Sequence, residues 1–303
     1  MKKVTVVGSL NIDHILRVST LPLKGETLIS NRYNLSEGGK GANQALAIAR
    51  LGVHVSMIGK VGGDIYGEML TKNLKESNVN VEGIIVDKIE KTGAAFITVN
   101  KNGDNTIVVA IGANGRLSTS DIKTMESKIL ESDIIVLQLE IPKDIVLYVI
   151  NFSKDIGKLV ILNFSPAIDI DKNILGKVDF LIMNEVEIKY LTSIDFKFSN
   201  MKAAIRELRK FFSKNIVVTL GEKGSVCATQ DGKILEVPAY SINPVDSTGA
   251  GDAFIGGFVL GLAKDKCIKD CAVFGNAAGA LSVAKSGAQS SLPYKDKLDG
   301  FLK

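Results

Sequence analysis

Short apolar runs rich in β-branched residues alternate along most of this chain with stretches in which apolar residues follow a helical period. Continuous apolar runs of this kind are typical of strands buried on both faces, as in a parallel sheet. The expected strands are Lys3–Val7, Val53–Ile58, Val81–Val86, Ile134–Leu139, Leu159–Leu162, Phe180–Met183 and Ile216–Leu220. The expected helices are Ala42–Leu51, Tyr66–Glu76, Ile122–Leu130, Ile145–Ile156 and Met201–Phe212. This alternation predicts an α/β sandwich with a doubly wound sheet and right-handed crossovers.

Two segments, Ile15–Leu35 and Thr92–Ile111, depart from the alternation because neither contains a helical pattern. Asn102-Gly103-Asp104 is a turn signal between two strand-like runs and predicts a hairpin. We expect the two segments to form a small antiparallel sheet that projects from the main domain. This sheet could be a lid over an active site or a set of ordinary edge strands. From Ala250 onward the pattern is mostly helical, with an interruption near Lys285–Ser291.

The composition of the chain argues against several classes of protein. Its net charge of +4 is small, and basic residues are scattered among acidic ones, so nucleic-acid binding is not predicted. The apolar run Ala253–Ala263 is too short to span a bilayer, and Asn11 and Asp13 interrupt the apolar start too early for a signal peptide. The cysteine pair Cys267 and Cys271 has no histidine nearby in the sequence, so no zinc site is expected. Unpaired cysteines suit a reduced, cytoplasmic protein.

The segment Asp246-Ser-Thr-Gly-Ala-Gly-Asp252 stands directly before an apolar helical run. Its glycines let backbone N–H groups turn toward one point, and a helix that begins there adds unpaired N–H groups and the positive end of its dipole. This combination favours an anion, most often a phosphate. Asp252 beside such a site is expected to take the proton from an acceptor hydroxyl. Neither a Walker A pattern nor G-x-G-x-x-G occurs, so the phosphate loop is of another kind.

Polar residues follow several of the expected strands, where open α/β sheets bind their ligands. Asn11 and Asp13 could hold vicinal hydroxyl groups or form an Asx turn, and Glu140 ends another strand in the same way. The glycines of Gly38-Gly-Lys-Gly-Ala-Asn43 allow close approach of a ligand, and Lys40 with Asn43 offers donors for hydroxyls or phosphate. The alternative for this segment is a tight turn with an exposed lysine.

Two further segments have both a functional and a structural interpretation. Asn184 and Glu187 could position hydrated Mg²⁺, or they could cap the helix that follows. The segment Thr219-Leu-Gly-Glu-Lys-Gly224 could contact a nucleotide, or it could be the turn of a plain hairpin.

Six motifs in order and at matching spacing resemble the ribokinase branch of the ribokinase/PfkB carbohydrate kinase family. They are Gly8-Ser-Leu-Asn-Ile-Asp13, Gly38-Gly-Lys-Gly-Ala-Asn-Gln44, Asn184-x-x-Glu187, Thr219-Leu-Gly221, Asp246-Ser-Thr-Gly-Ala-Gly-Asp252 and Lys285-Ser-Gly-Ala-Gln-Ser-Ser-Leu-Pro293. Each motif is weak alone, but six in register over nearly the whole chain are specific. The resemblance implies one ribokinase-like domain over residues 1–303, a three-layer α/β/α sandwich. It also implies a small β-sheet lid formed by segments of about 12–38 and 92–112.

The resemblance further implies ATP-dependent phosphorylation of D-ribose at its 5-hydroxyl, which gives ribose 5-phosphate. Asp252 would be the base, and Gly249, Ala250 and Gly251 would form the anion hole. The implied sugar contacts are Asn11, Ile12, Asp13, Gly39, Lys40, Gly41, Ala42, Asn43, Glu140 and Asp252. The implied sites for ATP phosphates, Mg²⁺ and the nucleoside are Asn184, Glu187, Thr219, Leu220, Gly221, Glu222, Lys223, Gly224, Gly251 and Asn276. The implied monovalent-cation site, taking K⁺, comprises Asp246, Thr248, Ser282, Lys285, Gly287 and Ser291. A homodimer formed through the lid is implied as well.

Two other functions stay open at this point. A related kinase could act on deoxyribose or a nucleoside instead, although Lys40 in the second motif favours ribose over fructose-like acceptors. A protein of a different class, a non-catalytic regulator that binds a sugar or nucleotide, could use the same fold. The intact Gly249–Asp252 segment favours an enzyme, because binding alone needs no base.

Overall fold

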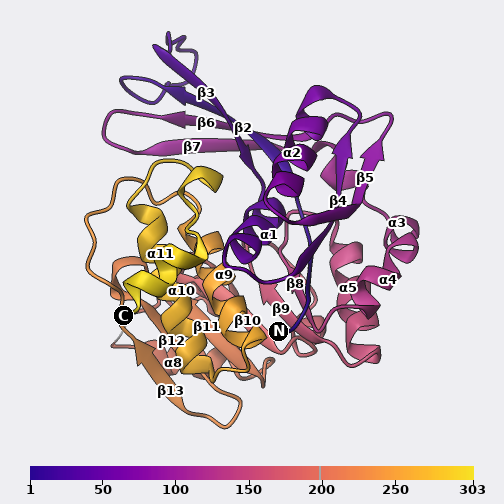
Figure 1. The fold of residues 1–303 in the computed structure, drawn as a ribbon. Coiled ribbons are helices and arrows are strands. Elements are labelled where there is room, and N and C mark those ends of the chain that lie inside the picture. The colour runs from indigo at the N-terminus through magenta and orange to yellow at the C-terminus, as the bar shows by residue number, and fades with distance from the viewer. Residues whose placement is uncertain (198) are drawn as a thin grey trace.

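The computed structural model describes residues 1–197 and 199–303, and a large sheet forms its centre (Figure 1). Within these residues the sheet has nine strands in the order β13-β12-β11-β10-β9-β8-β1-β4-β5. All neighbours from β11 to β5 pair in parallel, whereas β12 and β13 continue the sheet as antiparallel strands. The strands are β1 (Val4–Val7), β4 (Val55–Gly62), β5 (Asn80–Asp87), β8 (Ile134–Leu137), β9 (Leu159–Asn163), β10 (Phe180–Asn184), β11 (Asn215–Thr219), β12 (Ser225–Ala228) and β13 (Ile234–Val237).

Apolar side chains on both faces of this sheet pack under helices, which gives two cores. Along β8, Ile134 and Val136 belong to one core, and Ile135 and Leu137 belong to the other. The first core lies under α1 (Lys40–Arg50), α2 (Ile65–Glu76), α9 (Ala250–Ala263), α10 (Ile268–Val283) and α11 (Lys295–Phe301). The second lies under α3 (Thr119–Thr124), α4 (Glu126–Leu130), α5 (Lys143–Asp155), α6 (Lys172–Leu175), α7 (Glu185–Thr192) and α8 (Met201–Leu208). The expected three-layer α/β/α sandwich is therefore confirmed.

The expected elements are present, with differences at their ends. The single helix predicted for Ile122–Leu130 is wrong, because Met125 has non-helical dihedral angles and separates α3 from α4. β8 ends at Leu137, two residues early, and the N–H of Leu139 donates to the carbonyl of Ser165. Short 3₁₀ helices occupy Gly112–Arg116, Gly221–Lys223 and Gln289–Ser291. None of the helices in the described part of the chain has the length and apolar character needed to cross a bilayer.

A second, four-stranded sheet stands beside the sandwich as the lid (Figure 1). Its order is β3-β2-β6-β7, from β2 (Asn11–Arg17), β3 (Arg32–Gly38), β6 (Gly93–Val99) and β7 (Asn105–Ala110). The prediction of an antiparallel sheet is only partly right. Two antiparallel hairpins, β2–β3 and β6–β7, are joined by a parallel pairing of β2 with β6. The hydrophobic pattern cannot distinguish these two pairings, because both keep the same side-chain alternation.

Helix α9 passes through the centre of the first core, where glycines let neighbouring helices approach its backbone. A Cβ added at Gly257 would lie 2.3 Å from the carbonyl oxygen of Phe274 on α10. A Cβ at Gly256 would lie 2.6 Å from the Cβ of Ala47 on α1. The position of α9, and of every group at its N-terminus, therefore depends on these two close helix contacts.

We expect Gly257→Ala to lower the free energy of unfolding by about 1–3 kcal/mol, because the added methyl overpacks the contact with α10. Gly300→Ala in α11 is the matched control, since a Cβ there meets no heavy atom within 4 Å. That control should gain up to about 1 kcal/mol through helix propensity. Urea unfolding followed by circular dichroism measures both, and equal effects of the two substitutions would contradict the packing argument.

Candidate active site

The carboxylate of Asp252 lies at the N-terminus of α9, as its third residue. Gly249 is the N-cap with φ of +77°, a left-handed conformation that glycine adopts without strain. The N–H of Ala250 donates to the carbonyl of Ser247. In the described part of the chain, the N–H groups of Gly251 and Asp252 have no protein acceptor. Two free N–H groups at the positive end of a helix dipole make an anion-binding position beside the carboxylate.

Both oxygens of the Asp252 carboxylate accept hydrogen bonds from side-chain amides of α1. Asn43 Nδ2 donates to Oδ2 at 2.9 Å, and Gln44 Nε2 donates to Oδ1 at 2.9 Å. Asp252 is only 7% exposed. Burial raises the pKa of Asp252, whereas the Lys40 ammonium and the two amides act in the opposite direction. The residue is thus a buried carboxylate whose ionised form depends on its neighbours.

Lys40 is the positive centre among several carboxylates. Burial alone would lower the pKa of Lys40, but Asp252, Glu140 and Glu187 together raise it. Glu140 accepts hydrogen bonds from the Ser9 hydroxyl and from the N–H of Lys40, the first residue of α1. A cavity of about 240 Å³ lies beside these groups. It is lined by Lys40, Asn163, Ser165, Ile182, Met183, Asn184, Glu187, Thr219, Ser247, Gly249, Gly251, Asp252, Phe254 and Ile255.

Asn11 and Asp13 lie on the same face of β2, at the base of the lid. Asn114, which is buried, donates from Nδ2 to Asn11 Oδ1 at 2.8 Å and exchanges two hydrogen bonds with the backbone of Leu10. Asp13 packs against Gly38 of β3, where an added Cβ would lie 2.3 Å from Asp13 Oδ2. Burial raises the pKa of Asp13 to about 7, and the carboxylates of Glu140 and Asp252 act in the same direction.

The remaining predicted sugar contacts are two buried apolar residues and two glycines. Ile12 and Ala42 are 0% exposed, main-chain atoms included, so neither has accessible surface in the structure. Gly39 has φ of +87°, and a Cβ there would lie 2.7 Å from the backbone nitrogen of Asn11. A Cβ at Gly41 would lie 2.6 Å from the carbonyl carbon of Gly8. These glycines bring the start of α1 against the end of β1, which holds Lys40 and Asn43 opposite β2.

Asn184 and Glu187 form the helix cap that was one of their two interpretations. The Asn184 side chain accepts from the N–H groups of Val186 and Glu187, and Glu187 Oε2 accepts from the N–H of Asn184. Glu187 nevertheless lines the 240 Å³ cavity, and burial raises its pKa. Mg²⁺ in proteins takes one or two carboxylates and keeps several waters, so a single Glu187 carboxylate fits this ion. Within the described residues, no cluster of three or more metal-binding side chains occurs.

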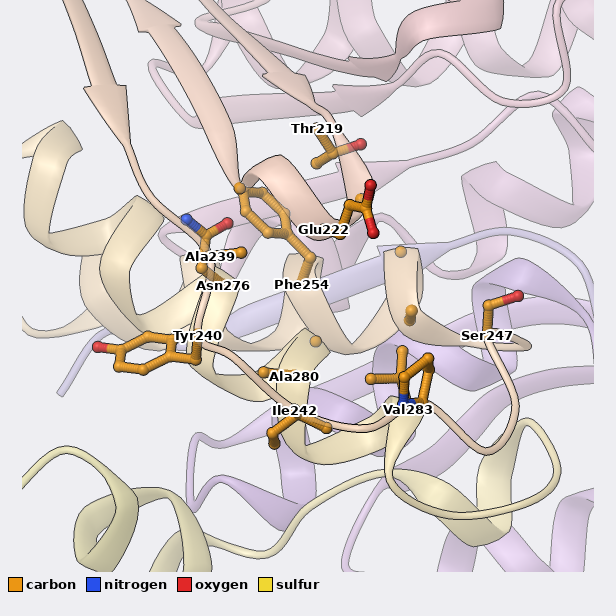
Figure 2. Close-up of a pocket in the computed structure, with 16 residues that line it drawn as sticks. Thr219, Glu222, Ala239, Tyr240, Ile242, Ser247, Phe254, Asn276, Ala280 and Val283 are labelled. Carbon is orange, nitrogen blue, oxygen red and sulfur yellow. The ribbon is translucent and has the colours of Figure 1, made fainter.

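A larger cavity of about 410 Å³ adjoins the smaller one and shares Thr219, Ser247, Gly251 and Phe254 with it. Figure 2 shows Tyr240 on the side of this cavity opposite Glu222 and Ser247. Its other walls include Ala239, Ile242, Pro244, Ala280 and Val283. An apolar cavity that opens at one end onto a helix N-terminus suits a nucleoside with its phosphates at that end.

Some of the residues predicted to bind the nucleotide line the larger cavity, and others do not. Thr219, Gly221, Glu222, Gly224 and Asn276 line the larger cavity. The lining of neither cavity includes Leu220, which is buried in the core, or the exposed Lys223. Asn276 also has a structural role, because its Nδ2 donates to the carbonyls of Val237 and Pro238. The segment Thr219–Gly224 is also the turn of a β11–β12 hairpin, so the structural interpretation of it is confirmed, and contact with a nucleotide stays a prediction.

Asp246 ties the loop before α9 to the segment after α10. Its Oδ1 accepts from the N–H and hydroxyl of Thr248, and its Oδ2 accepts from the N–H of Gly287. These hydrogen bonds outweigh burial and lower the pKa of Asp246. Nearby, the buried hydroxyls of Ser282 and Ser291 lie 2.9 Å apart, while the Lys285 side chain is exposed. The carboxylate, hydroxyls and carbonyls of this region are oxygen donors of the kind that fit a hard monovalent cation.

Comparison with known proteins decides the family. A model of the pfkB family of carbohydrate kinases matches residues 1–295. The chain belongs to this family. A ribokinase from Haemophilus influenzae is 37% identical over 99% of this chain and 98% of its own length. A deoxyribokinase from Salmonella typhi is 36% identical over 99% of this chain and 98% of its own length.

Solved structures of pfkB-family kinases agree with the fold described above. The Thermotoga maritima ribokinase has a TM-score of 0.91 and 35% identity, with 100% of this chain and 99% of that chain covered. The Arabidopsis thaliana ribokinase, solved with ribose and ATP, has a TM-score of 0.91 and 30% identity, with coverage of 100% and 99%. The observed layers and lid are therefore those of this kinase family, and the chain is a kinase.

Several polar residues of the site were missed by sequence reasoning. Asn163 ends β9 and accepts from Gln44 Nε2, and a polar residue at a strand end was a signal that could have revealed it. Asn114, Gln138 and Gln289 are buried amides that contact Asn11, Gln44 and Asn43. Gln289 lies within the Lys285–Pro293 motif, but no local pattern gives any of these three residues a role, because each acts on a partner that is distant in the sequence.

We expect Asp13→Asn to raise the free energy of unfolding, and to raise it more at pH 8 than at pH 5. The pKa of about 7 in the folded protein exceeds the ordinary 3.8, so ionisation above that ordinary value favours the unfolded chain. Removing the charge should add up to about 4 kcal/mol above pH 7.

Urea titrations at the two pH values measure this effect. Asp169→Asn, at an exposed loop position, is the matched control. A gain for Asp13→Asn that does not grow with pH would contradict the assignment.

Proposed function

We propose that this protein transfers the γ-phosphoryl group of ATP to the 5-hydroxyl of D-ribose and releases ribose 5-phosphate and ADP. One observation carries the proposal: the Asp252 carboxylate lies beside free N–H groups at the start of α9, where two cavities meet. Asp252 takes the hydroxyl proton as the acceptor oxygen attacks. The Gly249–Gly251 turn and the start of α9 stabilise the charge on the transferring group, with Gly251 and Asp252 N–H free to donate.

The acceptor sugar lies between β2 and the start of α1 in this proposal. Asn11 and Asp13 hold adjacent hydroxyls, and the ionised carboxylate of Asp13 can accept from a hydroxyl at both of its oxygens. Lys40 and Glu140 complete the set from the opposite side. Gly39 contributes a main-chain contact, while the buried residues Gly41, Ala42 and Ile12 hold the start of α1 against β1 and β2. Asn43 links the sugar to the base, since its amide already binds Asp252.

Mg²⁺ and a monovalent cation are part of the proposal. Glu187, with water and ATP phosphates, would hold Mg²⁺, which supplies positive charge against the phosphate oxygens. Asn184 fixes the Glu187 side chain through the helix cap. Asp246, with Thr248, Ser282, Ser291 and carbonyls near Lys285 and Gly287, would hold K⁺. Asp246 joins two segments that flank Gly249, so the same residue keeps the anion-binding turn in place.

The lid supports a proposal of a homodimer. All six residues of β7 are exposed, among them Ile107, Val108 and Val109 at 55%, 69% and 50%. Phe96, Tyr33 and Leu35 add apolar surface to the same sheet. Exposed apolar strands of this kind favour pairing with another chain, and a second lid offers a matching surface. We propose that two copies pack through these sheets and that each sheet covers its own sugar site.

Deoxyribose is the second candidate acceptor, because the deoxyribokinase from Salmonella typhi is as similar to this chain as several ribokinases are. The two sugars differ by one hydroxyl, so the choice between them rests on whether a buried polar group contacts that hydroxyl. Asn11 and Asp13 are the residues whose unpaired polar atoms would penalise the deoxy sugar.

A coupled assay over ribose, deoxyribose, fructose and nucleosides tests the acceptor, in potassium and in sodium buffers. We expect the largest kcat/KM for ribose, with at least about a tenfold advantage over deoxyribose from the missing hydroxyl contact. Faster turnover in potassium would support the monovalent-cation site. Turnover of another acceptor with ribose inert would refute the ribose assignment while leaving the kinase assignment intact.

Asp252→Asn should lower kcat at least about a hundredfold, because the amide cannot accept the hydroxyl proton. Ribose should still bind, since the other sugar contacts are unchanged. Steady-state kinetics and titration calorimetry measure the two properties separately. Near wild-type turnover in this variant would rule out Asp252 as the base.

A further inference from the structure

A chain of three side-chain amides connects the Asp252 carboxylate to helix α2. Asn43 Nδ2 donates to Asp252 Oδ2 at 2.9 Å, and Gln289 Nε2 donates to Asn43 Oδ1 at 3.0 Å. Asn73 Nδ2 then donates to Gln289 Oε1 at 2.6 Å. Asn43 belongs to α1, Gln289 to the segment after α10, and Asn73 to α2. Residues far apart in the sequence therefore meet in one line that ends at the proposed base.

The order of donors and acceptors in this line is directional. An amide side chain donates from its nitrogen and accepts at its oxygen, so turning one amide over exchanges the two ends. Because Asn73 donates to the oxygen of Gln289, the nitrogen of Gln289 faces Asn43. The nitrogen of Asn43 must then face Asp252. If Asn43 were turned over, its oxygen would face a carboxylate oxygen, and the carboxylate would lose a donor.

The middle of the line is held in place and shielded from water. Gln289 and Asn43 are 3% and 6% exposed. The backbone carbonyl of Gln289 accepts a hydrogen bond from Arg50 Nη1, which also binds the carbonyl of Leu292. Buried amides with fixed backbones keep their partners, because an unpaired polar atom is costly there. Asn73 is only half-buried, so it can be changed at the rim without opening the core.

We propose that Gln289 and Asn73 are positioning residues that orient the Asn43 amide and so keep Asp252 in its proton-accepting form. The proposal rests on the role of Asp252 as base, but on no particular acceptor sugar. Gln44 binds the other oxygen of Asp252 and has its own orienting partner, because Gln138 Nε2 donates to Gln44 Oε1 at 2.6 Å. Each carboxylate oxygen thus receives an amide whose direction is set by a second amide.

The charges that face Asp252 come from several elements. Lys40 on α1 favours the ionised form, while Glu140 after β8 opposes it. Asp13 on β2 and Glu187 on α7 are also coupled to Asp252. With burial opposing ionisation and these charges partly cancelling, the two amide donors contribute materially to the ionised form. Loss of one donor should therefore be visible in the pH dependence of turnover.

The test is Asn73→Asp, a change of nearly equal shape that contacts neither Asp252 nor Asn43. A carboxylate at position 73 accepts but does not donate, so the Gln289 amide turns over and the Asn43 amide follows. We expect the acid limb of the kcat–pH profile to move up by about one unit, which is about a tenfold loss of kcat on that limb. Activity should recover at high pH, and KM for ATP should stay unchanged.

The control variants separate the effect of this chain of amides from a general effect of charge or folding. Lys72→Gln makes the same change in charge at the neighbouring exposed position, and its profile should match the wild type. Gln289→Met removes the middle amide of the chain without adding charge. Because Asn43 is then no longer oriented, the acid limb of the kcat–pH profile should shift, but by less than in Asn73→Asp. In the double variant Asn73→Asp with Gln289→Met, the extra shift caused by Asp at position 73 should vanish.

All assays use the full chain and the acceptor that the wild type phosphorylates fastest, with thermal unfolding recorded for every variant. A wrong ribose assignment therefore leaves the test valid. An unshifted acid limb in folded Asn73→Asp would overturn the proposal. So would a shift that persists in the double variant, because it would come from charge alone. A uniform loss of kcat at every pH in Asn73→Asp or Gln289→Met would indicate a merely structural role and would also overturn it.

Discussion

The structure of this site depends on one constraint: the Asp252 carboxylate must be removed from water and still ionise. Burial opposes its charge, so the surrounding groups must compensate. The compensation comes from the start of α9, from two amides of α1 and from Lys40. Lys40 and both amides belong to α1, so the close approach of α9 and α1 through Gly256 and Ala47 holds all three beside the carboxylate.

The oxygen-rich side chains of the site converge because of the sheet topology. Parallel strands bring their carboxyl ends to one edge, so residues at or after the ends of successive strands converge there. Glu140 follows β8 in this way, and Asn163 and Asn184 are the last residues of β9 and β10. Lys40 is the cation at this edge, and the carboxylates of Asp252, Glu140 and Glu187 raise its pKa against the effect of burial. A site rich in carboxylates therefore keeps a fixed positive charge where phosphate and hydroxyl groups meet.

Much of this arrangement could be predicted from the sequence because its causes are local. The strands followed from continuous apolar runs, and the anion-binding turn followed from Gly249, Gly251 and the apolar helix behind them. The cap formed by Asn184 and Glu187 also needs only neighbouring residues. The break at Met125 and the parallel pairing of β2 with β6 were not predicted. Neither changes the hydrophobic pattern, so the pattern carried no information about them.

The rest of the site depends on contacts that no local pattern encodes. Gln289 reads as an ordinary polar residue in a Gly/Ser-rich tail, yet it is 3% exposed and holds Asn43. Asn114 lies in a short 3₁₀ helix, yet it fixes Asn11 more than one hundred positions earlier in the chain. The hydrogen bonds of these amides form only when the chain is folded and the distant partners are brought together. The role of each amide can therefore be assigned only from a structure that shows its partner.

Strand β2 has a consequence for how the enzyme couples its parts. The strand follows β1 of the central sheet and begins at Asn11, and Asn11 and Asp13 already lie in the lid sheet, where β2 pairs with both β3 and β6. The residues proposed to hold the sugar therefore lie in the lid sheet itself. Where binding at Asp13 shifts the position of this sheet, linkage makes the effect reciprocal. A protein surface that packs on the outer strands and holds the sheet in one position would then change the affinity for the acceptor without touching the acceptor.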